Sequence, residues 1–514
     1  MRMPDILLST LNARYSHASL GLRCLRANLG ALHQRSAIKE FVIGQKTEEI
    51  AEAILNEAPK ILGLGVYIWN CEESLKLVLM LKAIRPDLII VLGGPEVSYE
   101  SAEQQICKIA DYTITGWGDI SFGQLCAEIF AESAPEARII PGIQAKLPDL
   151  ASPYSEYTDE DIAQRHLYVE ASRGCPFKCE FCLSALDKTA WPFPLDAFLA
   201  DLEMLWQKGA RQFKFVDRTF NLKVETSLKI MDFFLDKIAE NPDDMPFAHF
   251  ELIPDHLPEK LKEAIVRFPE GTLQFEIGIQ TFNIEVQQRI SRKQKNELAR
   301  DNILWLGEHS GAHLHVDLIA GLPGETVDSF AEGFNRLVAL KPHEIQFGIL
   351  KRLRGAPIAR HTQDFELRFN PAPPYNILST NCIDFSEMQQ LSRFSRYWDI
   401  LANSGRYTQT MQVILADSAF HRFYDLSQWL YQKTRQTHAI AHERMVHLVH
   451  EYLIESRKLD AKLVADALIS DYRGTGGRSR LKFEDEKATL PLPRPQKHKK
   501  HTPDRQSRHL ATSV

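Results

Sequence analysis

The sequence lacks the features that would indicate a membrane, secreted or nucleic-acid-binding protein. No apolar stretch in its 514 residues is long enough to span a bilayer. The first residues, MRMPDILLSTLNARYSH, contain too short an apolar run for a signal peptide. The formal net charge of −6 is opposite in sign to that of a general nucleic-acid binder. We therefore expect a cytoplasmic protein with neither a membrane nor a nucleic acid as its partner.

Cysteine is scarce as well, and its distribution is uneven. Three of the eight cysteines lie in ASRGCPFKCEFCLSA with the spacing C-x3-C-x2-C, at Cys175, Cys179 and Cys182. Because cytoplasmic thiols stay reduced, this cluster indicates a metal site or catalysis rather than disulfides. We interpret most of the others as small buried apolar residues. They are Cys24, Cys71, Cys107, Cys126 and Cys382.

Short apolar runs alternate with helical patterns along residues 1–135. This alternation predicts a parallel sheet with helices on both faces, and so an α/β, Rossmann-like N-terminal domain. Ligands of such domains bind at the carboxyl ends of the strands. The candidate strands are 5–9, 41–43, 61–67, 88–94 and 112–115. Residues 136–165 are rich in prolines, turn formers and acids, and we interpret them as a linker.

Six further strand and helix patterns predict a partial (β/α)6 barrel over residues 166–355. The cysteine cluster begins three residues after the first of these strands, where βα loops of barrels carry catalytic groups. We expect a helical C-terminal domain over 356–472 and a disordered basic tail over 473–514. The candidate barrel strands are 167–172, 213–216, 249–253, 273–279, 314–320 and 344–350.

Three kinds of site could use the clustered cysteines. A structural zinc site needs a closed set of four ligands, and neither His166 nor Cys382 has finger-like spacing as the fourth. Disulfide redox chemistry favours an isolated C-x-x-C. A [4Fe–4S] cluster takes four ligands, so three thiolates leave one iron open to bind something else. We favour the iron–sulfur cluster because a large barrel needs no zinc to hold it together.

This cysteine motif resembles that of the radical S-adenosylmethionine (SAM) superfamily, and Arg173, Gly174, Pro176 and Phe181 match its flanks. The resemblance implies that the three cysteines hold a [4Fe–4S] cluster and that SAM chelates the open iron. It also implies that the reduced cluster breaks a C–S bond of SAM. The resulting 5′-deoxyadenosyl radical then abstracts hydrogen from a substrate. A reductant such as flavodoxin or ferredoxin is the partner expected from this resemblance.

The same resemblance implies which residues contact SAM. QFEIGIQTFN looks like the segment that contacts the ribose, and GLPGE looks like the glycine-rich loop near the adenine. The residues carried over are Glu276, Gln280, Gly321, Glu325 and Phe181. The Gly-Gly-Glu segment that binds the SAM amine in the family is absent, and Asp217 is our candidate for that role.

Polar residues also interrupt the barrel strands near their ends. Because unpaired charge in a packed barrel interior is costly, several such residues suggest a polar cavity. Outward-pointing side chains or internal ion pairs are the alternatives. The residues are Asp217, Glu251, Glu276, Gln280, Asp317 and Gln346.

A Rossmann-like domain before such a barrel resembles the cobalamin-binding class of the superfamily. The carried-over cofactor residues are glycines at strand ends, namely Gly93, Gly94, Gly116 and Gly118. In NARYSHASLG, His17 lacks the Asp and Gly of the D-x-H-x-x-G pattern, so a loop or surface histidine is favoured over a cobalt ligand. Methylthiotransferases resemble this layout too, but the first-strand loop here has no cysteine, and we expect no second cluster.

The resemblance implies an enzyme that methylates an unactivated carbon with SAM, a [4Fe–4S] cluster and cobalamin. Two alternatives stay open. One is a radical SAM oxidation, cyclisation or rearrangement, as in the Mg-protoporphyrin cyclase. The other, from a different class, is a non-catalytic iron–sulfur sensor or scaffold. No residue in the sequence identifies the substrate or a catalytic side chain.

Overall fold

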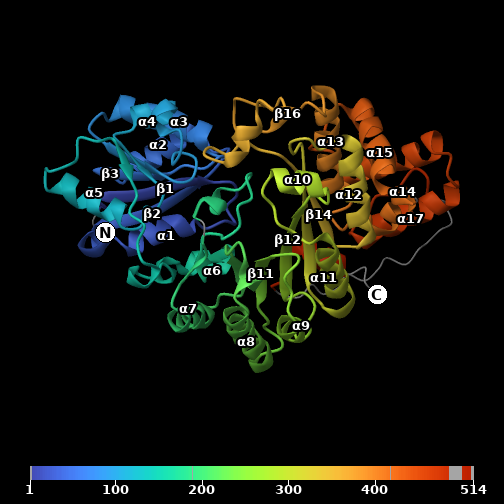
Figure 1. The fold of residues 1–514 in the computed structure, drawn as a ribbon, viewed down its shortest axis with the longest axis horizontal. Helices are drawn as coiled ribbons and strands as arrows, with labels where there is room; N and C mark the ends of the chain where they lie inside the picture. Colours follow the sequence, from blue (N-terminus) through green and yellow to red (C-terminus); the bar gives the residue numbers. More distant parts are fainter. Residues whose placement is uncertain (1–2, 188, 417, 485–500, 511–514) are drawn as a thin grey trace. The chain divides into compact units, whose positions relative to one another are not determined.

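The computed structural model describes residues 3–187, 189–416, 418–484 and 501–510 (Figure 1). The chain divides into two compact units. The first unit comprises residues 1–218, 351–359 and 370–376, and the second comprises 219–350, 360–369 and 377–514. Within the described residues, no helix has both the length and the apolar character that crossing a membrane requires.

A parallel sheet forms the centre of the first unit, drawn in blue in Figure 1. β1 (Ile6–Asn12) is buried at all seven of its residues, because helices cover both faces of the sheet. The strand order is β2-β1-β3-β4-β5-β6, and each neighbouring pair is parallel. The other strands are β2 (Ser36–Val42), β3 (Ile61–Gly65), β4 (Ile89–Gly93), β5 (Tyr112–Thr115) and β6 (Ile139–Pro141).

Side chains of this sheet alternate between two hydrophobic cores. Leu7 and Leu62 face the core that contains α2, α3 and α4, whereas Leu8 and Ile61 face the core that contains α1 and α5. Figure 1 shows these two sets of helices on opposite sides of the sheet. This two-faced packing is that of the predicted Rossmann-like domain. The helices are α1 (Leu20–Ala27), α2 (Thr47–Leu55), α3 (Cys71–Ile84), α4 (Gln105–Ile109) and α5 (Ser121–Phe130).

The stretch interpreted as a linker, residues 136–165, is folded onto the first unit. It contributes β6 and a short helix, α6 (Asp159–Gln164). Thr158 and Asp161 form a capping box at the start of α6. Asp161 also accepts a hydrogen bond of 2.7 Å from Arg23 of α1, and both side chains are buried. The acids that suggest a linker therefore cap a helix and pair with α1.

The first unit also contains the start of the predicted barrel. β7 (Leu167–Val169) pairs in parallel with β10 (Gln212–Phe215), and α7 (Leu195–Gln207) lies between them in the chain. Two short strands, β8 (Ser172–Arg173) and β9 (Trp191–Pro192), form an antiparallel pair around the cysteine loop.

The second unit contains four more parallel strands, in the order β11-β12-β13-β14. Phe275 and Ile277 are buried, whereas the alternate residues Glu276 and Gly278 are only partly buried, so β12 has an apolar and a polar face. All six strands predicted for the barrel are thus present in the chain. The strands here are β11 (Phe247–Leu252), β12 (Leu273–Gln280), β13 (His313–Ala320) and β14 (Glu344–Ile349). The helices are α8 (Val224–Glu240), α9 (Glu259–Ile265), α10 (Ile284–Arg289), α11 (Asn296–His309) and α12 (Val327–Ala339).

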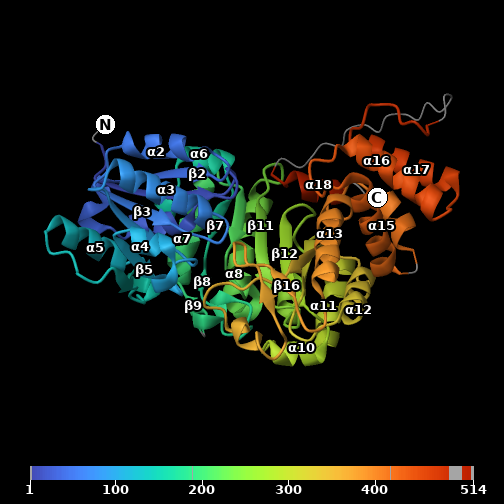
Figure 2. The same cartoon turned by 90° about the horizontal axis from the view of Figure 1, so that it is seen from above.

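The C-terminal region is helical, as predicted. Its core is aromatic: the rings of Phe334, Phe394 and Phe423 join α12, α13 and α15, with centroids 5.1 and 4.9 Å apart along this series. Figure 2 shows α13 beside α15 in this region. The elements are β15 (Arg368–Phe369), β16 (Ile377–Ser379), α13 (Phe385–Leu401), α14 (Thr408–Leu415), α15 (Ala419–Thr434), α16 (His442–Glu451), a π-helix (Tyr452–Ser456) and α17 (Ala461–Gly474).

Part of the tail predicted to be disordered, 473–514, is described. Residues 485–500 and 511–514 lie outside the described residues, but α18 (Asp504–Leu510) is a helix. Thr502 donates a hydrogen bond of 2.6 Å to the Gly271 carbonyl, and His509 lies 3.0 Å from the Asn403 carbonyl. These polar contacts give the segment a place on the second unit that its composition does not reveal.

The α6 cap provides a test of the folded linker. Asp161→Ala removes one carboxylate from the buried Arg23, and deleting one partner of a buried ion pair costs about 3 kcal/mol. We expect the free energy of unfolding of the first unit, measured by urea denaturation, to fall by about that amount. Asp159→Ala, in the same turn but exposed, is the control and should change little. Equal effects of the two substitutions would show that this stretch does not stabilise the unit.

Candidate active site

The three clustered cysteines lie in one loop of the first unit. The loop runs from β8 to Leu183, and Cys175 and Cys179 are buried while Cys182 is partly buried. The backbone N–H of Cys182 donates a hydrogen bond of 3.1 Å to the Cys179 carbonyl, which turns the loop back on itself. Burial, helped by the nearby thiols of Cys182 and Cys179, raises the pKa of Cys175 to about 11. A metal must therefore displace protons when it binds here.

These thiols fit an iron–sulfur cluster by their chemistry, since thiolates are the ligands of such clusters. In the described part of the chain, no three His, Cys, Asp or Glu side chains are already gathered closely enough to hold a metal ion. His166, a possible fourth ligand of a zinc site, lies with His17, and their ring centroids are 5.9 Å apart. The thiol of Cys382, the other such candidate, lies 3.3 Å from the Asn381 amide oxygen.

The start of the cysteine loop is braced by Asp217, which follows β10. Its carboxylate accepts hydrogen bonds from the Ala171 N–H at 3.0 Å and from the Ser172 hydroxyl at 2.6 Å. Asp217 is only 2% exposed, and this burial raises its pKa to about 7. Both carboxylate oxygens are thus engaged by the loop. This is the residue suggested by sequence for the SAM amine, and the structure places it as a support of the cysteine loop.

Gly174 fixes the next point of the loop. Its φ is +92°, a value that side-chain-bearing residues avoid, and a Cβ there would lie 2.3 Å from the Thr189 carbonyl oxygen. The position directly before Cys175 therefore requires glycine, because no side chain fits there. Phe181, two residues after Cys179, is partly buried in the same loop.

The other residues carried over for SAM belong to the second unit. Glu276 of β12 lies 3.1 Å from the His249 ring of β11. Gln280 ends β12 at a register shift, with φ of +69°. Glu325 is 1% exposed and accepts a hydrogen bond from Thr281, so the end of β12 and the loop after β13 are joined. Burial raises the pKa of Glu325 to about 8.

Gly321, from the glycine-rich loop, makes a close packing contact within the second unit. Its φ is +87°, and a Cβ there would lie 2.5 Å from the Ile377 side chain and 3.0 Å from that of Met388. The glycine therefore lets β16 and α13 approach the end of β13. The sequence resemblance gives this residue an adenine contact, and the structure adds a packing reason for the same glycine.

The polar strand residues of the second unit pair with histidines that the sequence analysis does not single out. His315 lies 3.4 Å from Asp317 and 2.9 Å from Gln346, and His313 lies 3.0 Å from Glu344. Internal pairing, one of the two alternatives to a polar cavity, therefore applies to Asp317, whereas Gln346 is exposed, which is the other alternative. Alternation along β13 and the matching register on β14 are the signals that could have paired them.

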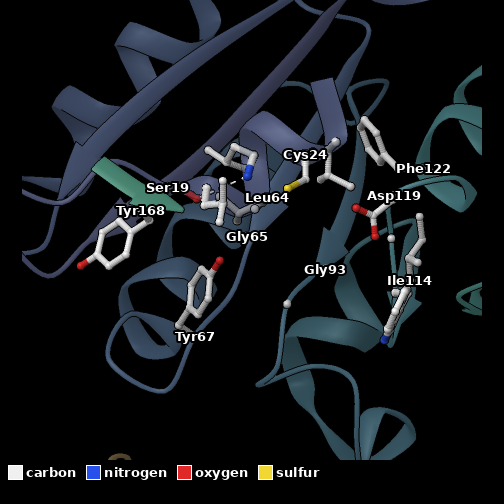
Figure 3. Close-up of a pocket in the computed structure, with 18 of the residues that line it drawn as sticks. Ser19, Cys24, Leu64, Gly65, Tyr67, Gly93, Ile114, Asp119, Phe122 and Tyr168 are labelled. Carbon is white, nitrogen blue, oxygen red and sulfur yellow. Dashed lines mark hydrogen bonds between the residues drawn. The ribbon is translucent and has the colours of Figure 1, made fainter. Parts of the chain in front are cut away.

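The first unit also contains a pocket of about 700 Å³ at the carboxyl ends of β1, β3, β4 and β5. This volume is in the range of ligand-binding pockets, about 300–1,000 Å³. Figure 3 shows Ser19, Tyr67, Gly93 and Asp119 around it. The pocket brings together all four glycines expected to bind a cofactor, Gly93, Gly94, Gly116 and Gly118.

The walls of the pocket fit a flat ligand. A Cβ on Gly93 would have only the Ile114 carbonyl oxygen within 4 Å, at 3.9 Å, so the glycine leaves space that a ligand can use. Tyr67 and Trp69 also line the pocket, and their rings stack with centroids 4.5 Å apart. Both aromatics follow the end of β3, and no motif in the sequence singles them out.

His17 lies in the loop between β1 and α1, in keeping with the loop position that the sequence favours, and it also lines this pocket. Its Nδ1 lies 2.5 Å from the Tyr168 hydroxyl. Burial, followed by the nearby His166, Lys214 and Arg14, lowers the pKa of His17 to about 4, so its ring is neutral at pH 7. A neutral ring held by a second side chain is the form in which histidine binds metals.

Comparison with known families agrees with these two sites. Residues 7–125 match the B12 binding domain, and residues 169–337 match the radical SAM superfamily. Residues 363–498, which contain most of the C-terminal helices, match a family described as protein of unknown function (DUF4080). The B12-binding match covers the pocket strands, and the radical SAM match covers the three clustered cysteines.

Curated relatives include two methyltransferases. One is the cobalamin-dependent radical SAM methyltransferase TokK of Streptomyces tokunonensis, 23% identical over 79% of this chain. Another is 2-(S-pantetheinyl)-carbapenam-3-carboxylate methyltransferase of Streptantibioticus cattleyicolor, 24% identical over 79% of this chain. The chain spans 66% of the length of each. The tRNA-2-methylthio-N(6)-dimethylallyladenosine synthase of a Psychrobacter species is 24% identical over 56% of this chain and 60% of its own length.

Solved structures share the fold. OxsB, a cobalamin-dependent S-adenosylmethionine radical enzyme with aqua-cobalamin bound, has a TM-score of 0.63 and 12% identity, covering 92% of this chain and 79% of OxsB. TsrM of Kitasatospora setae, a radical S-adenosylmethionine methyltransferase, has a TM-score of 0.57 and 14% identity, covering 74% of this chain and 79% of TsrM. These matches confirm the predicted fold class. The chain therefore carries a B12-binding domain, residues 7–125, ahead of a radical SAM domain, residues 169–337.

Proposed function

We propose that the protein is a cobalamin-dependent radical SAM enzyme that methylates an unactivated carbon of its substrate. One observation carries this proposal: a braced loop with three thiols and a strand-end pocket of about 700 Å³ occur in the same compact unit. When bound, the cluster and cobalamin supply reductive cleavage of SAM and a carrier for the methyl group. The chain itself positions both groups and limits the access of water to them.

The cysteine loop supports the cluster part of the proposal. Cys175, Cys179 and Cys182 supply three thiolates, and the left-handed backbone of Gly174, packed against Thr189, directly precedes the first of them. Three ligands leave one iron for SAM, and we propose Phe181 as a SAM contact. On the sequence resemblance alone, we also propose Glu276, Gln280, Gly321 and Glu325 as SAM-binding residues. We propose Asp217 as a positioning residue that shapes this site through Ala171 and Ser172.

The pocket supports the cobalamin part. Gly93, Gly94, Gly116 and Gly118 all lie on its wall, where the absence of side chains lets a macrocycle approach the backbone. The neutral ring of His17 adds a nitrogen on the same wall. We propose methyl transfer because TokK and the carbapenam enzyme, to which this chain is similar, are both methyltransferases.

A reductant such as flavodoxin or ferredoxin completes the proposal, because reductive cleavage consumes an electron. A cytoplasmic location follows from the same chemistry, since the cluster requires reduced thiols. The substrate's chemical class is left open by this proposal.

Removing one cluster thiol tests the metal site. Cys179→Ala should lower iron and sulfide content after anaerobic reconstitution and abolish the electron paramagnetic resonance (EPR) signal of the reduced cluster. Losing a residue that only orients a metal ligand lowers metal affinity by about 10- to 100-fold, and losing the ligand itself should cost more. Cluster affinity should therefore fall by more than about 100-fold. Cys382→Ser, a partly buried cysteine of the second unit, is the matched control and should keep full iron content. Wild-type spectra from the Cys179 variant would rule out this site.

Filling the pocket tests the cobalamin site. Gly93→Val places a branched side chain where only one protein atom lies within 4 Å, so the chain should fold normally. The added side chain overlaps the ligand, and the dissociation constant for hydroxocobalamin should rise at least about tenfold, as expected for 1–3 kcal/mol of overpacking. Gly474→Val is the control, because a Cβ on Gly474 meets nothing within 4 Å and this residue lies on α17, away from the pocket-lining residues. Unchanged hydroxocobalamin binding by the Gly93 variant would place the cofactor elsewhere.

A further inference from the structure

A buried group of charges connects the wall of the pocket to the cysteine loop. Arg173 donates to Asp119 at 2.9 Å from one nitrogen and to Glu170 at 2.5 and 3.3 Å from two others. Asp119 and Glu170 are 6% and 7% exposed. Burial disfavours the charged guanidinium, but the two carboxylates outweigh burial and raise the pKa of Arg173 above its usual value. We refer to Arg173, Asp119 and Glu170 as the Arg173 cluster.

The Arg173 cluster forms part of the pocket wall. All three side chains line the pocket of about 700 Å³, and they also line an adjoining cavity of about 100 Å³. Asp119 ends the glycine loop that follows β5, and Figure 3 shows it at the edge of the pocket. In the same loop, the ring of Trp117 lies 4.8 Å from the guanidinium carbon of Arg173. A ligand in the pocket therefore meets the groups that hold Arg173.

The other end of this connection is Cys175, two residues after Arg173. Gly174 lies between them, and its backbone is confined by the Thr189 carbonyl oxygen. Arg173 itself pairs with Trp191 in the β8–β9 ladder, and Ser172 is held by Asp217. Because only Gly174, which is packed against the Thr189 carbonyl oxygen, separates Arg173 from Cys175, we expect a displacement of the guanidinium to shift the first cysteine of the loop.

The charges make this connection stiff. Two carboxylates and one guanidinium in a water-poor site attract one another strongly, and separating them leaves an uncompensated buried charge. The planar guanidinium binds both carboxylates at once, which an ammonium group cannot do with the same geometry. When the loop that carries Asp119 moves, we therefore expect the three side chains of the Arg173 cluster to move together with it.

We propose that Arg173 is a positioning residue that couples the occupancy of the pocket to the stability of the cluster held by the cysteine loop. The inference rests on the proposed function, because it requires both cofactors. A corrinoid in the pocket fixes Trp117 and Asp119, these fix Arg173, and Arg173 fixes the loop at Cys175. By thermodynamic reciprocity, a loaded cluster must favour corrinoid binding by the same factor.

The test measures how fast reconstituted, full-length protein loses its cluster to an iron chelator under anaerobic conditions. The rate is compared with and without saturating hydroxocobalamin. In the wild type we expect hydroxocobalamin to slow the loss by about fivefold or more, the lower end of typical coupling between sites. In Arg173→Gln the two rates should be equal at a hydroxocobalamin concentration that saturates the variant, with saturation checked by corrinoid absorbance. Arg173→Lys keeps the positive charge but not the planar guanidinium. For this variant, the ratio of the rate without hydroxocobalamin to the rate with it should lie between those of the wild type and Arg173→Gln.

The matched control is Arg165→Gln. Arg165 also pairs with two carboxylates, Glu40 and Asp161, but lines neither cavity, so its loss should leave the wild-type ratio unchanged. If Arg173→Gln does not fold, Asp119→Asn takes its place, because it keeps the shape of the side chain and removes one charge. This variant should reduce the effect of hydroxocobalamin on the rate of cluster loss.

Two results overturn the coupling alone: equal rates in a wild type that does bind hydroxocobalamin, or an undiminished ratio in Arg173→Gln. The second would mean that the corrinoid merely shields the cluster from the chelator. A wild type that binds no hydroxocobalamin contradicts the cobalamin part of the proposed function, and the coupling with it.

Discussion

The confinement of a single loop underlies both proposed sites. Asp217 holds the loop at Ala171 and Ser172 with two hydrogen bonds, and the backbone at Gly174 is closed in by Thr189. A loop of three cysteines without such support would lose conformational entropy when it binds metal, and this loss would weaken binding. Here the backbone is already fixed where the first thiol begins, and only the side chains and the following turn need to adjust.

The sheet of the first unit provides the pocket, which the proposed function requires in addition to the cysteine loop. Its strands are covered on both faces, so the space for a ligand is at their carboxyl ends, where the loops after β1, β3, β4 and β5 form the pocket. The Asp119 loop belongs to this pocket wall, and it is also the loop that binds Arg173. One set of loops therefore serves the pocket and the cysteine loop together, without a separate connecting element.

Much of the fold could be predicted from the sequence, because buried parallel strands are continuous apolar runs. The six barrel strands and β1, β3, β4 and β5 follow from this pattern. β2 (Ser36–Val42) is partly exposed and mixed in composition, and only its end was predicted. β6 is short and exposed at two of its three residues, and it lies among prolines that suggest a linker. α18 and the fold of residues 136–165 depend on long-range polar contacts, which local patterns do not contain.

The candidate site also combines features that local sequence patterns reveal with features that depend on long-range contacts. The cysteine motif and the strand-end glycines could be identified because their spacing and chemistry are local. The Arg173 cluster could not, because Asp119 and Arg173 are 54 positions apart and only the fold brings them together. The support that Asp217 gives to the cysteine loop could not be predicted from the sequence either, because its hydrogen bonds to Ala171 and Ser172 join residues that follow β7 and β10. The position of Arg173 directly before the Gly174–Cys175 pair was the only local signal.

The most direct test of the central claim is the fate of SAM on the reduced protein. Anaerobically reconstituted protein is mixed with dithionite and SAM, and the products are quantified by mass spectrometry. The account predicts 5′-deoxyadenosine formed over repeated turnovers, with corrinoid absorbance in the purified protein. An intact, reducible iron–sulfur cluster that leaves SAM uncleaved would contradict it and would favour a non-catalytic sensor or scaffold.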